Sequence, residues 1–462
     1  MSNNQNKLYV IGLTLVATLG GLLFGYDTAV ISGAEKSIQA FLIDSQGLSS
    51  FIHGATTSSA LIGCIIGGAI SGMLSSKFGR KRSLMLAALL FLVSALGSGY
   101  PEFLFFEKGV PSISLLMMFN LYRIIGGIGV GLASAISPVY IGEIAPADIR
   151  GRLVSINQFA IIFGMLVVYF VNWGIANGQS IEWINSVGWR YMFLSEAIPA
   201  SIFGILLFFV PETPRYLALT NRNEEALRVL TNINGSERAK EIITEIKNTL
   251  DHHSSKIFSY GKKVVIIGIL LSVFQQFVGI NVALYYAPRI FESMGAAKDA
   301  SMLQTVVMGL VNVVFTVFAI TTVDKLGRKP LLIIGSIGMA VGMFAISGLA
   351  YFNVIGISTL IFIIIYTASF MMSWGPITWV LISEIFPNKI RGRAVAIAVA
   401  FQWAANYFIS STYPAMMEYS GTMTYGFYGL MSILSAIFVW KMIPETKVKT
   451  LEELEKLWKS NK

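Results

Sequence analysis

Residues 143–152 read EIAPADIRGR and residues 384–393 read EIFPNKIRGR, so one charged motif occurs twice, 241 positions apart. Two further motifs recur in the same order: SKFGRK at 76–81 returns as DKLGRK at 324–329, and PETPR at 211–215 returns as PETK at 444–447. Three markers repeated about half the chain apart indicate an internal duplication.

The composition is that of a membrane protein. The 462 residues are 55% hydrophobic and only 13% charged, whereas soluble domains carry about 25% charged residues. A membrane-spanning helix needs roughly 20 mostly apolar residues. Because the apolar runs are continuous and not alternating, they favour helices over a transmembrane barrel. Twelve such runs occur, near 8–31, 50–74, 83–100, 113–139, 153–174, 190–210, 263–290, 301–323, 330–352, 357–382, 393–416 and 424–443.

The duplication and the runs together predict an all-α membrane protein with twelve transmembrane helices in two pseudo-symmetric halves. We expect six helices in residues 1–210 and six in 263–443, joined by a cytoplasmic helical linker at 211–262 and followed by a tail helix at 444–462. Repeats of this kind, with the site between them near the membrane midplane, are a known transporter plan.

The net charge of +9 is explained by topology. If both termini are cytoplasmic, all but six of the 34 Lys and Arg residues lie on the cytoplasmic side, as the positive-inside rule requires. We therefore expect a multi-pass protein of the cytoplasmic (inner) membrane, surrounded by lipid, with no nucleic acid partner. No cleavage-like site follows the opening MSNNQNK, so the first helix is expected to be retained.

The linker and the tail carry amphipathic patterns. In residues 236–250 one face at helical spacing is apolar, and in the tail Thr450 and Glu453 form a capping box. We expect both segments to pack under the membrane core. The adjacent His252 and His253 are a weak metal signal, and no metal site is expected. The apolar face comprises Ala239, Ile242, Ile243, Ile246 and Leu250.

The repeated motifs resemble those of the sugar porter family of the major facilitator superfamily, and the likeness runs along essentially the whole chain. It is closest to the bacterial D-xylose–proton symporters of that family, through LVATLGGLLFGYDTAVISG, YRIIGGIGVGLAS, NQFAIIFG, FQQFVGIN, LYYAP and MSWGP. The resemblance implies the major facilitator fold and uptake of a monosaccharide, with D-xylose favoured, by proton symport. It also implies a monomer with no cofactor besides the coupling proton. One departure is Ser76, where the second copy has the acidic Asp324.

A sugar is neutral, carries many hydroxyl groups and has apolar C–H faces. Its site therefore needs amides, which both donate and accept hydrogen bonds, and aromatic rings. Several polar and aromatic residues within the apolar runs match the sugar-contacting positions of the family, and Gly375 matches a backbone position. The predicted substrate-binding residues are Phe24, Gln158, Gln275, Gln276, Asn281, Tyr285, Asn312, Gly375, Trp379, Gln402 and Trp403.

Gln275 and Asn281 are six residues apart, about 240° around a straight helix, and would not share a face. Gly279 lies between them. We expect a break there that directs both amides inward, as in other discontinuous transporter helices.

Asp27 lies inside the first apolar run, and Arg123 is the basic residue deep within another. A charge at the bilayer centre costs at least about 2.5 kcal/mol, so such residues pair or line a water-filled path. We expect Asp27 and Arg123 to pair. The resemblance assigns them to proton coupling, with Glu196 assisting. A static ion pair is the structural alternative.

The loop motifs place charged residues at the cytoplasmic ends of helices. The resemblance implies that they form ion pairs that hold the two halves together when the cavity opens outward. The alternative is that the arginines only fix the topology. The predicted cytoplasmic gate comprises Arg80, Glu143, Arg150, Arg328, Glu384 and Arg391.

Other functions remain open at this point. A passive facilitator, or a porter for glucose, another hexose or a polyol, shares the same pattern. A sugar sensor would carry a long signalling tail, whereas about 19 residues follow the last run. An enzyme is not expected, and no catalytic residues are predicted, because neither a phosphate-binding G-x-x-x-x-G-K-[ST] motif nor an H-E-x-x-H zinc motif occurs.

Overall fold

The computed structural model describes residues 3–103, 105–146, 149–249, 258, 260–293, 295, 297–354, 357–387 and 390–446. This part of the chain is helical, and it contains twelve helical segments long and apolar enough to cross a membrane. The predicted twelve transmembrane helices are confirmed, and the chain is a multi-pass membrane protein.

The first half contains six spans built from α1 to α9. A π-helix extends α1 beyond the predicted end of the first span, and a turn at Ser58 separates α2 from α3. The elements are α1 (Asn3–Ile38), η1 (Gln39–Ile43), η2 (Asp44–Gln46), α2 (Ser50–Thr57), α3 (Ser59–Phe78), α4 (Arg80–Gly99), α5 (Ile113–Ile144), α6 (Arg150–Ala176), α7 (Ile181–Trp183), η3 (Ile184–Gly188), α8 (Trp189–Ser195) and α9 (Ala197–Phe209).

Three short helices form the linker, and six further spans form the second half. Two of those spans are broken, between α13 and α14 and between α18 and α19. The elements are α10 (Pro214–Leu219), α11 (Asn223–Asn234), α12 (Ser236–Thr249), α13 (Lys262–Phe277), α14 (Ile280–Tyr285), α15 (Ala287–Ser293), α16 (Lys298–Leu326), α17 (Arg328–Tyr351), α18 (Ile357–Met371), α19 (Trp374–Ile385), α20 (Arg391–Tyr419) and α21 (Gly421–Met442).

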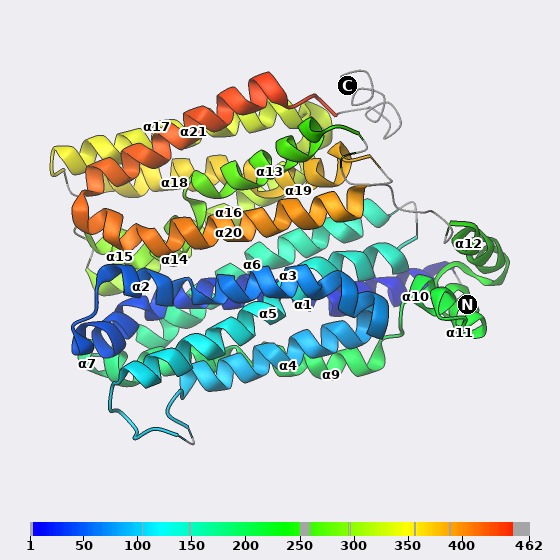
Figure 1. Cartoon of the computed structure of the whole chain (residues 1–462), viewed down its shortest axis with the longest axis horizontal. Coiled ribbons are helices and arrows are strands. Elements are labelled where there is room, and N and C mark those ends of the chain that lie inside the picture. Colours follow the sequence, from blue (N-terminus) through cyan, green and yellow to red (C-terminus); the bar gives the residue numbers. More distant parts are fainter. Residues whose placement is uncertain are drawn as a thin grey trace.

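The two halves lie side by side with their long helices running in one general direction (Figure 1). Linker helices α10 to α12 lie beyond one end of this bundle, at the right of the view, which we call the linker end. α2, α7 and α15 lie toward the opposite end, which we call the far end. The halves meet where α2 and α3 contact α20, where α6 contacts α16, and where α1 contacts α14 and α15.

Glycines let the helices of the first half touch backbone to backbone. A Cβ atom added at Gly25 of α1 would lie 1.9 Å from the carbonyl oxygen of Ile161 in α6, and one at Gly164 would lie 2.1 Å from that of Leu22. The two glycines, one on each helix, therefore allow α1 and α6 to come into close contact. Within a membrane no hydrophobic effect drives helices together, so their association depends on the close van der Waals packing that small residues permit.

The repeated motifs form one structural unit in each half. In the first half, Gly79 turns the chain with φ 93° before α4 begins. The carboxylate of Glu212 accepts hydrogen bonds from the backbone N–H groups of Arg80 and Lys81, each at 3.1 Å. Burial raises the pKa of Glu212, although these N–H groups stabilise its carboxylate.

The second half repeats this unit. Gly327 has φ 92° before α17, and Glu445 accepts from the N–H groups of Arg328 at 3.1 Å and Lys329 at 3.0 Å. The first turn of a helix has N–H groups without intrahelical partners, and a carboxylate there is also favoured by the helix dipole. The glutamates of the two PET motifs are therefore helix caps, a role that the sequence reasoning did not assign.

The predicted linker helix corresponds to α12. Ala239 is fully buried and Ile242, Ile243 and Ile246 are half-buried, as the amphipathic pattern predicts. The other residues singled out in these segments lie outside the described part of the chain: Leu250, His252, His253, Thr450 and Glu453.

The two caps give a stability prediction. Replacing Glu212 or Glu445 by Ala leaves two N–H groups at a helix start without their acceptor, so each change should lower the free energy of unfolding by about 0.5–2 kcal/mol. Thermal unfolding of the detergent-solubilised protein would measure this as a lower midpoint. Glu107→Ala, which removes an exposed loop carboxylate, is the control. Equal midpoints for all three variants would contradict the capping role.

Candidate functional site

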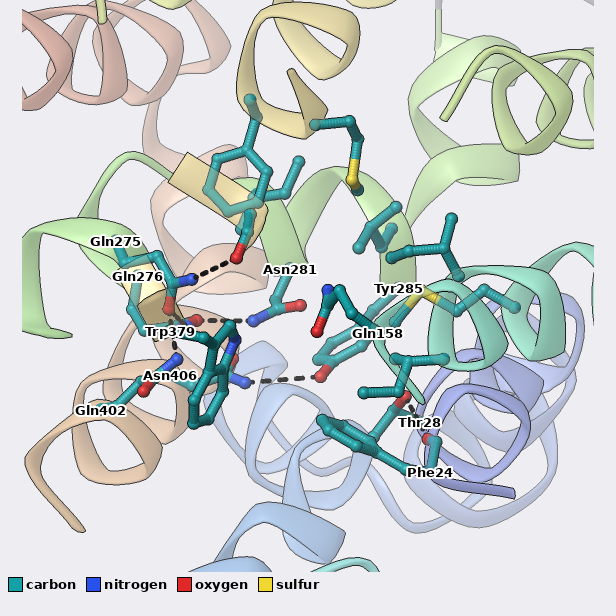
Figure 2. Close-up of a pocket in the computed structure, with 18 of the residues that line it drawn as sticks. Phe24, Thr28, Gln158, Gln275, Gln276, Asn281, Tyr285, Trp379, Gln402 and Asn406 are labelled. Atoms are coloured by element: carbon teal, nitrogen blue, oxygen red, sulfur yellow. Dashed lines mark hydrogen bonds between the residues drawn. The ribbon is translucent and has the colours of Figure 1, made fainter. Parts of the chain in front are cut away.

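A cavity lies between the two halves, lined from α1 and α6 on one side and from α13, α14, α18, α19 and α20 on the other. Figure 2 shows amide and aromatic side chains from both halves facing one space. Ten of the eleven predicted substrate-binding residues line it: Phe24, Gln158, Gln275, Gln276, Asn281, Tyr285, Gly375, Trp379, Gln402 and Trp403.

The break between α13 and α14 brings the predicted amides together. Gly279 adopts φ 90°, and the Tyr366 hydroxyl donates to the carbonyl oxygen of Val278 at 2.8 Å. As a result Asn281 Nδ2 donates to Gln276 Oε1 at 2.5 Å. The break expected at Gly279 is confirmed, and it orients side chains that a straight helix would separate.

The second broken span supplies backbone acceptors. α18 ends at Met371, and α19 begins at Trp374. Gln275 Nε2 donates to the buried carbonyl oxygen of Trp374 at 3.0 Å. The indole of Trp374 is buried and donates to Ser336 Oγ at 2.8 Å, which fixes the start of α19. Met371 and Gly375, on either side of the break, line the cavity.

The amides form a connected chain. Gln276 Nε2 donates to Gln275 Oε1 at 3.1 Å, and Gln402 Nε2 donates to the same oxygen. Each amide keeps further donor or acceptor capacity beyond these bonds. The chain can therefore exchange internal hydrogen bonds for bonds to the hydroxyl groups of a ligand.

Aromatic rings form the remaining wall. Phe24 of α1 and Trp403 of α20 approach with ring centroids 5.5 Å apart, so the two halves meet through an aromatic pair. Trp379 and Tyr285 lie near the amides in Figure 2. The buried indole nitrogen of Trp403 has no hydrogen-bond partner within the described part of the protein, which leaves it as a free donor beside the cavity.

The cavity differs from the prediction in two respects. Asn312 is buried in α16 and is not a lining residue. Asn406 was missed, although it lines the cavity, donates to Tyr285 Oη at 3.4 Å and accepts from Ser410 at 3.0 Å. Asn406 lies four positions after Gln402, hence on the same helix face, and this spacing was the available signal. Thr28 and the apolar Ile161, Ile162, Met165, Ile280, Leu284, Phe370 and Met371 also line the cavity.

Asp27 and Arg123 are paired, as expected. Arg123 Nη1 lies 2.7 Å from Asp27 Oδ1, and Arg123 Nη2 donates to the Asp27 carbonyl oxygen at 3.1 Å. Both side chains are almost completely buried. The guanidinium also lies over the ring of Phe193, 5.2 Å from its centroid.

Glu196 is fully buried where α8 gives way to α9, and it interacts electrostatically with Asp27 and Arg123. Neither oxygen of Glu196 nor Oδ2 of Asp27 has a hydrogen-bond partner in the described residues. One guanidinium thus faces two buried carboxyl groups.

This charged group adjoins the cavity without lining it. Phe24 and Thr28, which flank Asp27 on α1, are lining residues, whereas Asp27 points to α5 and α8. A change of protonation in this charged group would therefore act on α1, which forms one wall of the cavity.

Among the described side chains, the predicted gate residues form one ion pair in each half. Arg80 Nη2 lies 2.8 Å from Glu143 Oε1 in the first half, and Arg328 Nη2 lies 3.0 Å from Glu384 Oε1 in the second. The side chains of Arg150 and Arg391 lie outside the described part of the chain.

Comparison with known proteins gives one family. The sequence profile of the family described as "Sugar (and other) transporter" matches residues 13–458. The D-xylose-proton symporter of Escherichia coli (strain K12) is 52% identical, covering 99% of this chain and 97% of that protein. The arabinose-proton symporter of Bacillus subtilis (strain 168) is 43% identical, covering 99% and 97%.

A solved structure agrees with this result. The inward-open conformation of the xylose transporter XylE from E. coli matches with a TM-score of 0.89 at 53% identity, covering 97% of this chain and all of that one. The chain therefore belongs to the sugar (and other) transporter family and has the twelve-helix fold of the major facilitator superfamily.

Proposed function

We propose that this protein takes up a monosaccharide, with D-xylose as the favoured sugar, together with a proton. The buried Asp27–Arg123 pair beside an amide-lined cavity is the observation that carries the proposal. The names of two similar proteins, a D-xylose-proton symporter and an arabinose-proton symporter, support both the pentose and the coupling ion.

The cavity suits a small neutral sugar. Gln275, Gln276 and Gln402 supply amides that donate to and accept from hydroxyl groups. Phe24 and Trp403 supply aromatic surface for the C–H face. Because a ligand would hold amides of one half and an aromatic ring of the other, its binding would favour conformations in which the halves close around it.

The proton switch works through competing effects on Asp27. Arg123 favours the carboxylate, and desolvation favours the neutral acid. Protonation removes the charge that holds Arg123, which then has Glu196 as its alternative partner. The halves can rearrange only after this exchange, so sugar and proton move together.

The coupling has a definite energetic value. A membrane potential of 100 mV supplies about 2.3 kcal/mol per charge. Since about 1.4 kcal/mol corresponds to a tenfold ratio, one proton supports roughly a fiftyfold sugar gradient.

We also propose how the protein is oriented, in which membrane it lies, and that its gate residues make additional contacts between the halves. The positive-inside rule places the linker end in the cytoplasm of a bacterial cell, in the inner membrane, with the far end outside. The repeated arginines, including Arg150 and Arg391, would bridge the halves only in the outward-facing state. No cofactor other than the proton takes part.

The coupling proposal predicts a separation of two activities. In vesicles, Asp27→Asn should abolish D-xylose accumulation above equilibrium while downhill exchange survives, because a neutral amide at this position cannot release a proton. The native protein should accumulate the sugar only under an imposed proton gradient. Asp44→Asn, which changes an exposed carboxylate at the far end, should behave as the native protein does.

Two results would contradict parts of this proposal. If the gradient makes no difference to the native protein, it is a facilitator. If glucose moves and xylose does not, the coupling argument stands and the favoured sugar is wrong.

The cavity predicts a binding defect. Gln275→Ala removes the centre of the amide chain and leaves the Trp374 carbonyl without its donor, so D-xylose affinity should fall about tenfold or more, from the loss of roughly 1.5 kcal/mol. Isothermal titration of the purified protein would measure it. Gln304→Ala changes a half-buried glutamine of α16 that is not a lining residue and should bind normally. Equal affinities for both variants would exclude Gln275 from the site.

A further inference from the structure

The two halves are in direct contact at the far end. A Cβ atom added at Gly54 of α2 would lie 2.0 Å from the carbonyl oxygen of Ser411 in α20, so these helices touch through their backbones. At the same end the hydroxyl of Ser50 donates to Glu418. The two halves therefore pack directly against each other at this end.

A buried carboxylate of the first half is held by a guanidinium of the second. Arg289 Nε donates to Glu35 Oε1 at 2.8 Å, and Arg289 Nη2 donates to Glu35 Oε2 at 2.7 Å. The side chain of Glu35 is 1% exposed and that of Arg289 is 26% exposed. Parallel two-bond pairing of this kind is among the strongest polar contacts and fixes the relative orientation of its partners.

A third helix joins this contact. His53 Nε2 of α2 lies 3.2 Å from Glu35 Oε2 and 3.3 Å from the Glu35 carbonyl oxygen. Since both neighbours are acceptors, Nε2 carries the hydrogen. The ring of His53 meets the edge of Tyr286, whose hydroxyl donates to the Ser410 carbonyl oxygen in α20.

A second ion pair lies beside the first with opposite polarity. Lys36 of α1 pairs with Glu292 of α15, which also accepts from Ser301 at 3.1 Å. α1 thus presents an acid followed by a base, and α15 presents a base followed by an acid. This pair is more exposed, at 40% and 22%, and exposed pairs contribute little stability. Its reciprocal order instead fixes which residues of α1 and α15 meet.

Within the described residues, the ion pairs that join the two halves are these two, and both lie at the far end. The corresponding pairs at the linker end stay within one half. We propose that Glu35 and Arg289, with His53 as a positioning residue, form a far-end latch that holds this conformation closed to the outside. The proposal does not depend on which solute or ion is carried, but that the far end faces the outside rests on the orientation proposed above.

The energetics of the latch depend on its burial. The carboxylate of Glu35 has lost nearly all contact with solvent, so its stability depends on the donors from Arg289 and His53. Opening the far end would separate Glu35 from Arg289 and require water to replace those donors. Removing one charge makes the closed state less favourable relative to the open state, in which either residue is hydrated.

The test is a pair of distance measurements on the full chain in lipid nanodiscs. Spin labels at Ser45→Cys and Tyr419→Cys, both exposed at the far end in opposite halves, report its opening. Labels at Ser76→Cys and Thr321→Cys report the linker end. Each protein carries Cys64→Ala to remove the one native cysteine.

We expect Glu35→Gln and Arg289→Gln each to raise the population with a wide far-end distance about fivefold or more, the usual lower range for conformational coupling. The linker-end distance should shorten in the same samples. Glu107→Gln, an exposed carboxylate at the same end, should leave both distances unchanged. Unchanged distances in the Glu35 and Arg289 variants would overturn the proposal.

The double variant separates the latch from the effect of an unpaired charge. Glu35→Gln with Arg289→Gln leaves no orphan charge, so it folds even where a single variant does not. It should still show the wide far-end population. A return to the native distances in the double variant would show that orphan charge, and not loss of the latch, opens the far end. Far-end widening without shortening at the linker end would indicate local fraying and would also overturn the proposal.

The role of His53 is tested by its conservative replacement. His53→Gln retains an N–H donor toward Glu35, whereas His53→Leu does not. The leucine variant should raise the wide population and the glutamine variant should restore most of the closed population. Equal effects of the two replacements would show that His53 only packs against Tyr286.

Discussion

A carboxylate within a membrane-spanning helix needs a partner charge or a proton, and much of the first half is arranged around this requirement. Asp27 of α1 is held by Arg123 of α5, and Glu196 at the junction of α8 and α9 completes the group. The three residues come from three different spans, so their mutual placement depends on how closely those helices pack. The backbone contacts that Gly25 and Gly164 permit between α1 and α6 keep α1 in place. A single buried charge pair therefore depends on the packing of the whole half.

The second half is organised around interrupted helices instead of buried charge. At the breaks before α14 and before α19, the backbone carbonyl groups of Val278 and Trp374 accept hydrogen bonds from side chains. Polar groups inside a membrane are otherwise costly, and here Gln275, Gln276 and Asn281 each bond to another polar group of the cavity wall. Hydrogen bonds connect Gln275, Gln276 and Gln402. These bonds can be exchanged for bonds to a sugar.

The fold was largely predictable because hydrocarbon thickness sets the length of a spanning helix and because the repeated motifs divide the chain. The break at Gly279 was predictable from a residue that tolerates positive φ. The break before Trp374 had a signal that was not used: Pro376 has no N–H group to donate to the Met372 carbonyl, so a continuous helix is disfavoured there. Asn312 matched the family pattern but is not a lining residue, since helix rotation is set by neighbours that a sequence does not show. The pairing of Glu35 with Arg289, 254 positions apart, likewise depends on how the halves meet.

The charged triad of Asp27, Arg123 and Glu196 belongs wholly to the first half, whereas the cavity amides other than Gln158 belong to the second. Under the proposed function, the residues for the coupling ion and most polar residues for the cargo are thus carried by different copies of one duplicated unit. Substitutions in the second half would then alter the choice of cargo without touching the charged triad. Loss of one acid in the first half would uncouple the transporter. Only the contact surface between the copies must satisfy both functions.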